Sequence, residues 1–183
     1  MELGDRLSAN SLDARIGVAV LIETLRILRS TPYEVYFAFT VHGRTRGRGI
    51  PPAAYGIEPE VGIIVAGSLA GDTPGELKVP MELGGGPCIM ICDKSMTTSP
   101  AVVDWMITSA KKAHIPVQRG VLQEGSTEAM KLQVCGNGVL TGGLFIPVRY
   151  LHSSSPMVDN KDIENAVKLL RVMLVKPISL PGH

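Results

Sequence analysis

The residue with the clearest chemical potential in this chain is His152, which follows an apolar run from Phe145 to Val148. Such a run predicts a buried strand, and the end of a strand is where α/β sheets place their ligands. An imidazole at that position can bind a metal, transfer a proton or form hydrogen bonds in a loop. A single histidine fits all three roles, so His152 alone does not predict an activity.

The three cysteines, Cys88, Cys92 and Cys135, do not add a metal or redox motif. Cys88 and Cys92 lie four residues apart in an apolar run, which places them on the same face of a predicted strand. No CxxC pair is present, and an odd number of cysteines argues against a disulfide framework. The pattern favours buried thiols in a cytoplasmic protein.

Helical and strand patterns alternate along the whole chain. Asp13 stands just ahead of the first helix and is predicted to cap it, and Asp159 is predicted to cap the last one. Helices are expected within 12–28, from Pro100 through Ala110, at 127–134 and at about 161–175, and strands at 34–41, 61–66, 88–92, 117–122 and 139–146. The strand at 34–41 is apolar on both sides, which predicts a central position in the sheet.

This alternation predicts an α/β fold, a three-layer sandwich with a mixed, mostly parallel sheet. With 183 residues and no linker or internal repeat, the chain is expected to form a single domain over 1–183. The apolar residues (45%) include few aromatics (4%), so aliphatic side chains are expected to build the core.

Charge and hydropathy exclude several classes of function. The net charge is +1 and no long basic run occurs, so nucleic acid is not an expected partner. The charged N-terminal residues do not resemble a signal peptide. No apolar run approaches the ~18 residues of a membrane span, and a cytoplasmic location away from membranes is therefore expected.

Several motifs in order along the chain resemble those of the glutamyl/leucyl metallo-aminopeptidases that form tetrahedral (TET) particles, some of which carry a cellulase or endoglucanase label. The similar segments are Leu3–Arg6, Ser11–Gly17, Pro32–Tyr36, Gly71–Gly75 and Pro147–Ser153. The resemblance implies a phosphorylase/hydrolase-like (zinc aminopeptidase-like) fold, two bridged divalent metals and removal of N-terminal residues from peptides. It also implies that this chain lacks the family's N-terminal segment, which supplies a histidine ligand, and its inserted β domain.

Within this resemblance, only two metal ligands match. Asp13 corresponds to the bridging carboxylate and His152 to the last histidine ligand. The remaining positions carry residues that do not bind metals: Ala14, Gly43 in place of the general base, Arg44, and Ala66. Two bridged metals need donors from several sides and a further carboxylate to take a proton from water, so the resemblance implies a degenerate site.

Two hypotheses concern the residues around Asp13. In the first, Arg44 replaces the metal: its guanidinium pairs with Asp13 and hydrogen-bonds His152. The other possibility for Arg44 is that its side chain extends into solvent from a glycine-rich loop. Alternatively, His42 joins Asp13 and His152 in a mononuclear site with two histidines and one carboxylate, although strand alternation turns His42 and its neighbours to opposite faces.

The sequence therefore predicts a non-catalytic protein with an aminopeptidase fold that acts through homo-oligomerisation or binding, and no cofactor is expected. The alternative is a metal-dependent aminopeptidase, with zinc or cobalt, that takes its missing ligands from a partner chain or rebuilds a one-metal site from His42, Asp13 and His152. Peptides are possible partners under either hypothesis.

Overall fold

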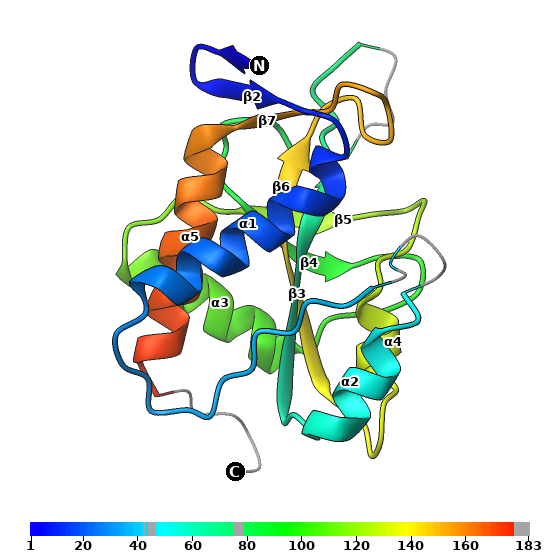
Figure 1. Ribbon diagram of the computed structural model, residues 1–183, viewed down its shortest axis with the longest axis vertical. Helices are drawn as coiled ribbons and strands as arrows, with labels where there is room; N and C mark the ends of the chain where they lie inside the picture. Colours follow the sequence, from blue (N-terminus) through cyan, green and yellow to red (C-terminus); the bar gives the residue numbers. More distant parts are fainter. Residues whose placement is uncertain (42, 44–46, 75–78, 178–183) are drawn as a thin grey trace.

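The computed structural model describes residues 1–41, 43, 47–74 and 79–177, which form the predicted three-layer α/β sandwich (Figure 1). The central sheet has the strand order β3-β6-β4-β5. Neighbours β3 and β6 are parallel, as are β4 and β5, whereas β4 and β6 are antiparallel. The sheet is thus mixed and mostly parallel, as predicted. Its strands are β3 (Val61–Leu69), β4 (Cys88–Cys92), β5 (Gln118–Val121) and β6 (Leu140–Val148).

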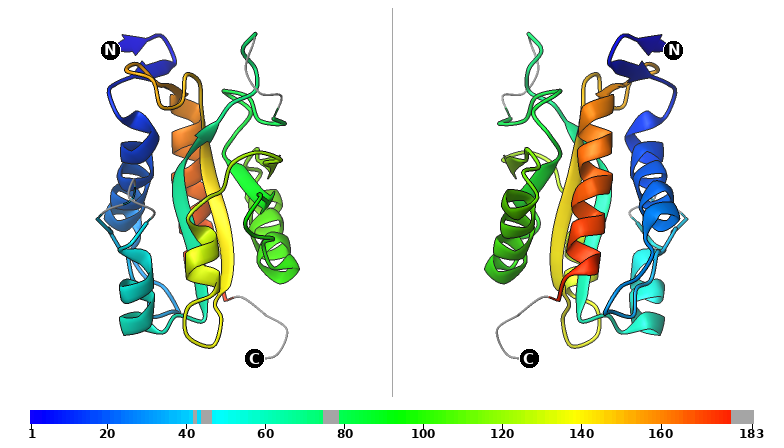
Figure 2. Two further views of the ribbon diagram at one scale, coloured as in Figure 1. Left: turned by 90° about the vertical axis from the view of Figure 1, so that its right-hand side faces the viewer. Right: turned by 90° about the vertical axis from the view of Figure 1, so that its left-hand side faces the viewer.

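Helices lie on both faces of this sheet. Figure 2 shows α4 in front of the strands in one view and α5 in front of them in the other, with α1 beside the outer edge of β3. Helices α1, α3 and α5 pack in the largest hydrophobic cluster, and α2 and α4 pack in a smaller one. Their bounds are α1 (Leu12–Ile27), α2 (Ile50–Ile57), α3 (Pro100–Lys112), α4 (Ala129–Gln133) and α5 (Asn160–Val175).

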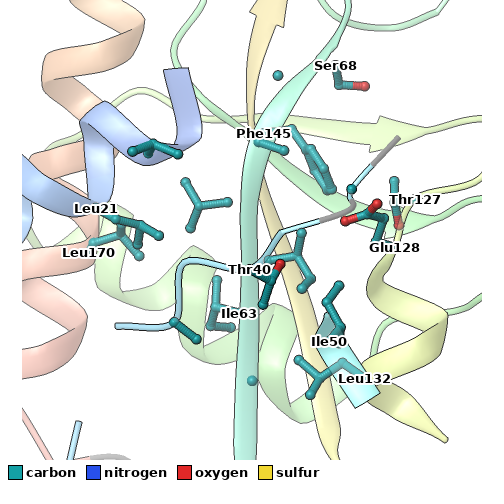
Figure 3. A pocket seen from close by; sticks show the side chains of 18 of the residues that line it. Leu21, Thr40, Ile50, Ile63, Ser68, Thr127, Glu128, Leu132, Phe145 and Leu170 are labelled. Carbon is teal, nitrogen blue, oxygen red and sulfur yellow. The ribbon is translucent and has the colours of Figure 1, made fainter. Parts of the chain in front are cut away.

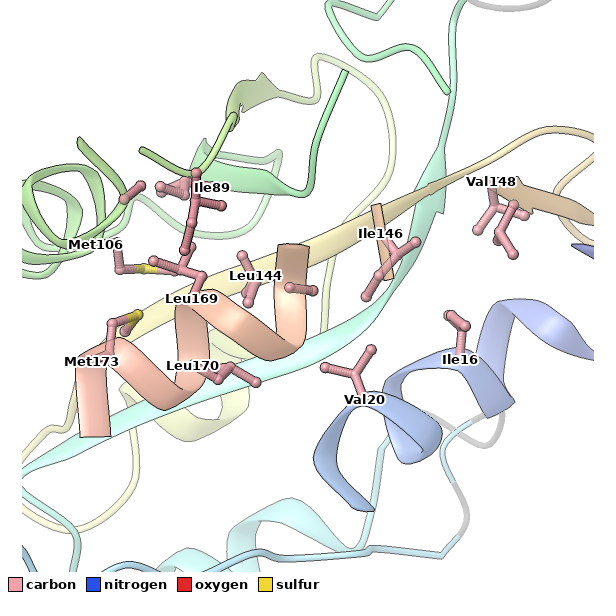
Figure 4. Packing of buried hydrophobic residues seen from close by; sticks show 14 of the residues in the cluster. Ile16, Val20, Ile89, Met106, Leu144, Ile146, Val148, Leu169, Leu170 and Met173 are labelled. Carbon is pink, nitrogen blue, oxygen red and sulfur yellow. The ribbon is translucent and has the colours of Figure 1, made fainter. Parts of the chain in front are cut away.

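The main core lies between β6 and the helices α1, α3 and α5. Leu144 and Ile146 project from β6 toward Val20 of α1, Met106 of α3 and Leu169 of α5 (Figure 4). All five side chains are fully buried. Each such side chain contributes about 1.5–3 kcal/mol through removal of apolar surface from water, so this cluster fixes β6 and the turn that follows it.

The predicted strand at 34–41 is wrong. The segment runs as an irregular trace between α1 and α2 (Figure 1), and Tyr36, Phe39 and Val41 are exposed. Its side chains still alternate in exposure, because Val35 and Phe37 are half-buried. A strand requires a hydrogen-bonded neighbour as well as an apolar pattern, and no described strand pairs with this segment.

The chain start forms a second, small sheet that the sequence did not predict. It joins β1 (Glu2–Leu3), β2 (Arg6–Ser8) and β7 (Met157–Asp159) in antiparallel pairs. At its end Asp159 accepts a hydrogen bond from the Lys161 N–H at 2.9 Å, which confirms the predicted cap of α5. The predicted cap of α1 is wrong, because Ser11 occupies the N-cap position and Asp13 lies within the first helical turn.

The cysteines are free, and Cys88 is fully buried in β4. Burial raises the pKa of the Cys88 thiol to about 12, so this group does not ionise near neutral pH. Cys92 and Cys135 are only half-buried. Among the described residues, no helix combines the length and the apolar character needed to cross a bilayer.

Candidate functional site

Asp13 and His152 lie in direct contact, although 139 positions separate them. The distance from His152 Nδ1 to Asp13 Oδ2 is 3.1 Å. Asp13 projects from the first turn of α1 and its side chain is only 9% exposed, whereas the His152 side chain is 68% exposed. When Nδ1 carries the proton and donates to Asp13, the Nε2 lone pair is left available to a ligand from solvent.

A strained turn after β6 brings His152 to this position. Tyr150 and His152 both have left-handed backbone angles, with φ of 56° and 64°. The Ser153 N–H donates to the Tyr150 carbonyl at 3.1 Å, which closes the turn. Left-handed angles cost about 1–2 kcal/mol for a residue with a Cβ, so neighbouring contacts must hold this turn in place.

The strongest of those contacts is an ion pair between Arg149 and Asp72. Arg149 Nε donates to Asp72 Oδ1 at 2.9 Å and Nη2 donates to Oδ2 at 2.7 Å. Both side chains are mostly buried (18% and 16% exposed). The hydrogen bonds from Arg149 lower the pKa of Asp72 although burial opposes this. The pair links the turn that carries His152 to the loop after β3, where the Leu83 N–H also donates to Asp72.

Sequence reasoning gave neither Arg149 nor Asp72 a role. Both residues lie within the segments that carry the family resemblance. The opposite charges of the two residues are the signal in the sequence for an ion pair, but 77 positions separate them. Only the packing of the loop against the end of β6 shows that they meet.

Three of the positions predicted to be degenerate, Ala14, Gly43 and Ala66, are described by the structure and line the same cavity as Asp13. Ala14 is exposed on α1, and Ala66 of β3 packs against the cluster that contains Phe145. A Cβ added at Gly43 would lie 3.6 Å from Glu128 Oε1. His42 and Arg44 lie outside the described residues, so the Arg44–Asp13 pair and the site that includes His42 remain predictions.

Glu128 is a further carboxylate at this site. The turn Gly125–Glu128 precedes helix α4, with Glu128 at the N-cap position. Partial burial raises the pKa of Glu128, while the positive charge of Lys131 opposes the shift. Glu128 is therefore more easily protonated than an ordinary glutamate.

Asp93 holds this turn in place. One Asp93 oxygen, Oδ2, accepts hydrogen bonds from the N–H and the hydroxyl of Thr127 at 2.8 and 2.6 Å. The other, Oδ1, accepts from Ser95 and from the Met96 N–H. Burial opposes ionisation of Asp93, but these hydrogen bonds outweigh it and lower the pKa.

A large cavity of about 1680 Å³ opens beside these residues. Asp13 and His152 lie on its wall with Glu128, and all nine residues of β3 also line it. Figure 3 shows Leu21 and Leu170 on one side of β3 and Glu128 with Leu132 on the other. The cavity therefore extends around the outer edge of β3 onto both faces of the sheet.

The described donors do not fit a pair of bridged metals. Such a centre needs carboxylate and imidazole ligands from several sides. Asp13 and His152 are in contact, but the part of the chain that the structure describes contains no group of three or more His, Cys, Asp or Glu side chains placed to hold a metal ion. No catalytic step through a metal follows from these residues alone.

Comparisons with known proteins agree with this fold. The family model of the M42 glutamyl aminopeptidases matches residues 1–169 of this chain. A lysyl aminopeptidase of Pyrococcus furiosus is 32% identical over 176 residues, which is 94% of this chain and 50% of that protein. The structure of aminopeptidase APDkam598 from Desulfurococcus kamchatkensis superposes with a TM-score of 0.93 at 32% identity and covers 97% of this chain and 51% of that one.

A third similar structure is that of the TET1 peptidase of Pyrococcus horikoshii, which can assemble into a tetrahedron or a large octahedral shell. It has a TM-score of 0.79 at 29% identity and covers 94% of this chain and 51% of that one. The chain spans about half the length of the curated relatives that it matches.

Proposed function

Because this chain belongs to the M42 glutamyl aminopeptidase family, we propose that it is a non-catalytic, aminopeptidase-fold protein that acts through binding and self-association. The observation that carries the proposal is the ligand set around Asp13 and His152. These two side chains meet at 3.1 Å, while Ala14, Gly43 and Ala66 occupy the positions where the family resemblance implies a supporting carboxylate, the general base and a metal ligand. A site with two described ligands lacks the donors that a bridged pair of metals requires.

Self-association is supported by an apolar stripe on α1. Val18, Ile22 and Leu25 are spaced along one face of the helix and all three are exposed. Exposed apolar side chains that lie together mark interaction surfaces. The TET1 relative assembles into closed shells, and this chain is proposed to form homo-oligomers in the same general manner.

Two assays test the loss of catalysis. Elemental analysis is expected to find less than stoichiometric zinc or cobalt in the purified chain. Hydrolysis of amino-acid anilides with added zinc or cobalt is expected to stay at the level of a buffer blank. Stoichiometric metal, together with turnover that disappears in His152→Ala, would reverse the proposal.

Light scattering tests the self-association. The wild-type chain is expected to scatter as an oligomer, and Ile22→Lys is expected to shift it toward the monomer because it places a charge in the apolar stripe. A matched control is Glu23→Lys, which changes a neighbouring exposed residue outside the stripe. A monomeric wild-type chain at all accessible concentrations would contradict self-association.

The alternative function is a metal-dependent aminopeptidase that removes N-terminal residues from peptides. The retained contact between Asp13 and His152 favours it, because two elements distant in sequence still converge on one point. This function would require further donors beside Asp13 and His152, either His42 in a one-metal site or residues of a partner chain, and the metal assay above separates it from the first proposal.

A further inference from the structure

One face of strand β4 carries a group of buried sulfur atoms. Alternation along the strand sends Ile89 into the main core and turns Cys88 and Met90 to the opposite face of the sheet. There they belong to a cluster with six buried members, of which four carry sulfur and are here called the sulfur cluster: Met81, Cys88, Met90 and Met96. Among the described residues, the main core has two sulfur-bearing side chains in sixteen buried members, Met106 and Met173. Sulfur is thus concentrated on this face of β4.

Two of these sulfur atoms flank one point beside the neighbouring strand. Met90 lies opposite Gly120 of β5 in the register of the two strands. A Cβ added at Gly120 would collide with Cys88 Sγ and would lie 3.3 Å from Met90 Sδ. The glycine therefore lets a thiol and a thioether approach the same position beside β5.

The sulfur cluster is closed to water and packs against aliphatic side chains. Cys88 and Met90 are fully buried, and Met81 and Met96 are only 2% and 5% exposed. The partly buried hydrophobic residues packed against the cluster are Ile64, Ala66, Val79 and Leu122. A ligand that enters this environment must leave little net charge there, because uncompensated charge is costly away from water.

These donors and this environment together select a soft, monovalent metal ion. Thiolate and thioether sulfur prefer soft ions such as Cu(I), whereas carboxylate and carbonyl oxygens prefer hard ones. One thiolate and one Cu(I) ion have no net charge, while one thiolate and Zn²⁺ would leave a positive charge among apolar side chains. The donor set also differs from a cluster of His, Cys, Asp and Glu, of which the described residues contain none, because methionine supplies most of it.

We infer that the sulfur cluster binds one Cu(I) ion, with the Cys88 thiolate and the Met90 thioether as its first two ligands. Met81 and Met96 supply thioethers that complete the coordination, since methionine side chains are flexible and adapt to an irregular space. Binding forms a Cu–S bond, breaks the S–H bond of Cys88 and releases that proton to water; no electron is transferred, and the copper stays monovalent. Burial raises the pKa of the Cys88 thiol to about 12, so at neutral pH the proton leaves only when the ion displaces it.

The large cavity gives the ion an entry path. Phe145 belongs to the same buried cluster as the four sulfur-bearing residues and also lines the cavity, as do Ala66 and Val79 (Figure 3). The sulfur cluster thus lies directly behind a wall of the cavity, and displacement of Phe145 admits the ion from that side. The site shares no residue with the contact between Asp13 and His152, so it goes beyond the proposed function and does not depend on it.

Titration with copper tests the inference. The full chain is titrated under nitrogen with Cu(I), supplied as its acetonitrile complex, in the presence of the chromogenic Cu(I) chelator bicinchoninate. It is expected to withdraw one equivalent of Cu(I) from the chelator and, in weakly buffered solution without chelator, to release one proton for each ion bound. Zn²⁺ is expected to bind at least about 100-fold more weakly, because thioethers are poor ligands for harder ions. Absence of copper uptake, uptake without proton release, or equal binding of zinc would overturn the inference.

Matched variants locate the ion. Cys88→Ser is expected to weaken Cu(I) binding at least about 100-fold and Met90→Leu at least about tenfold, because loss of an outer-shell partner alone costs about that much. Leu and Met are similar in volume, so Met90→Leu tests the site even if Cys88→Ser fails to fold. The controls are Cys135→Ser, outside the sulfur cluster, and Met106→Leu, in the main core, and both are expected to bind as the wild type does. Cu(I) binding that survives both cluster variants, or that is lost in Cys135→Ser or His152→Ala, would overturn the inference.

Discussion

Strands β3 and β6 lie side by side, have the same length and are similarly apolar, yet their environments differ. They pair residue for residue over nine positions. Eight residues of β6 are buried, whereas in β3 only Ser68 is. Within the described part of the chain, β6 has a strand on each side, whereas β3, at the end of the strand order, has one on one side only. Burial in this sheet therefore depends on position in the strand order rather than on composition.

The largest effect is expected from truncation of a side chain in β6. Leu144→Ala should lower the free energy of unfolding by about 2–5 kcal/mol, because it leaves a cavity among fully buried side chains. Ile64→Ala in β3 should lower it by only about 1 kcal/mol, since Ile64 is half-buried. Urea unfolding of the two variants measures the difference, and equal losses would mean that β3 is covered in solution.

A smaller effect is expected at the ion pair that joins the ends of the two strands. Asp72→Asn should lower the free energy of unfolding by about 1.5–3 kcal/mol at neutral pH, because it weakens a charge-assisted pair and leaves Arg149 mostly buried. The exposed pair of Glu164 and Lys168 supplies the control, and Glu164→Gln should cost less than about 0.5 kcal/mol.

The ion pair of Asp72 and Arg149 should also make the stability of the folded chain depend on pH. The pKa of Asp72 in the folded chain lies below its ordinary value of 3.8, so its contribution is fully present above that value. The contribution is lost as the pH falls through the lower, folded pKa. The melting temperature of the wild type should therefore fall between neutral pH and strong acid, and this fall should be smaller in Asp72→Asn. Equal falls in the melting temperatures of the two proteins would exclude a contribution of Asp72 to this pH dependence.

The smallest effect is expected at His152. His152→Ala should change the free energy of unfolding by less than about 1 kcal/mol, because the side chain is mostly exposed and its contact with Asp13 is screened by water. A double-mutant cycle with Asp13→Asn measures the coupling between the two residues. A coupling of several kcal/mol would indicate a buried pair and a structural rather than a residual functional role.

Local patterns in the sequence predicted most helices and strands, and long-range pairing explains the failures. Asp159 was recognised as a cap because its hydrogen bond reaches only two residues ahead. The segment 34–41 has strand-forming residues, but whether it pairs depends on a neighbour that no local pattern identifies. Helix α2 was missed, since Pro51, Pro52 and Gly56 in so short a run resemble a loop.

The candidate site was predicted only in part, because several of its contacts also join segments that lie far apart in the sequence. The family resemblance singled out Asp13 and His152, and the structure brings them together. Their function is a prediction that the assays above address. Asp93 and its contacts with Thr127 were missed, because hydrogen bonds across 34 positions depend on how two loops pack.

The outer edge of β3, which no strand of the described residues covers, also has a consequence for how the chain behaves at high concentration. The strand Val61–Leu69 carries no charge and no proline along its nine residues, which are the features of segments that stack into cross-β fibrils. Chains in which nothing covers this edge are expected to associate through it into amyloid-like aggregates before they unfold. Solubility, more than melting temperature, would then limit the working range of the isolated protein.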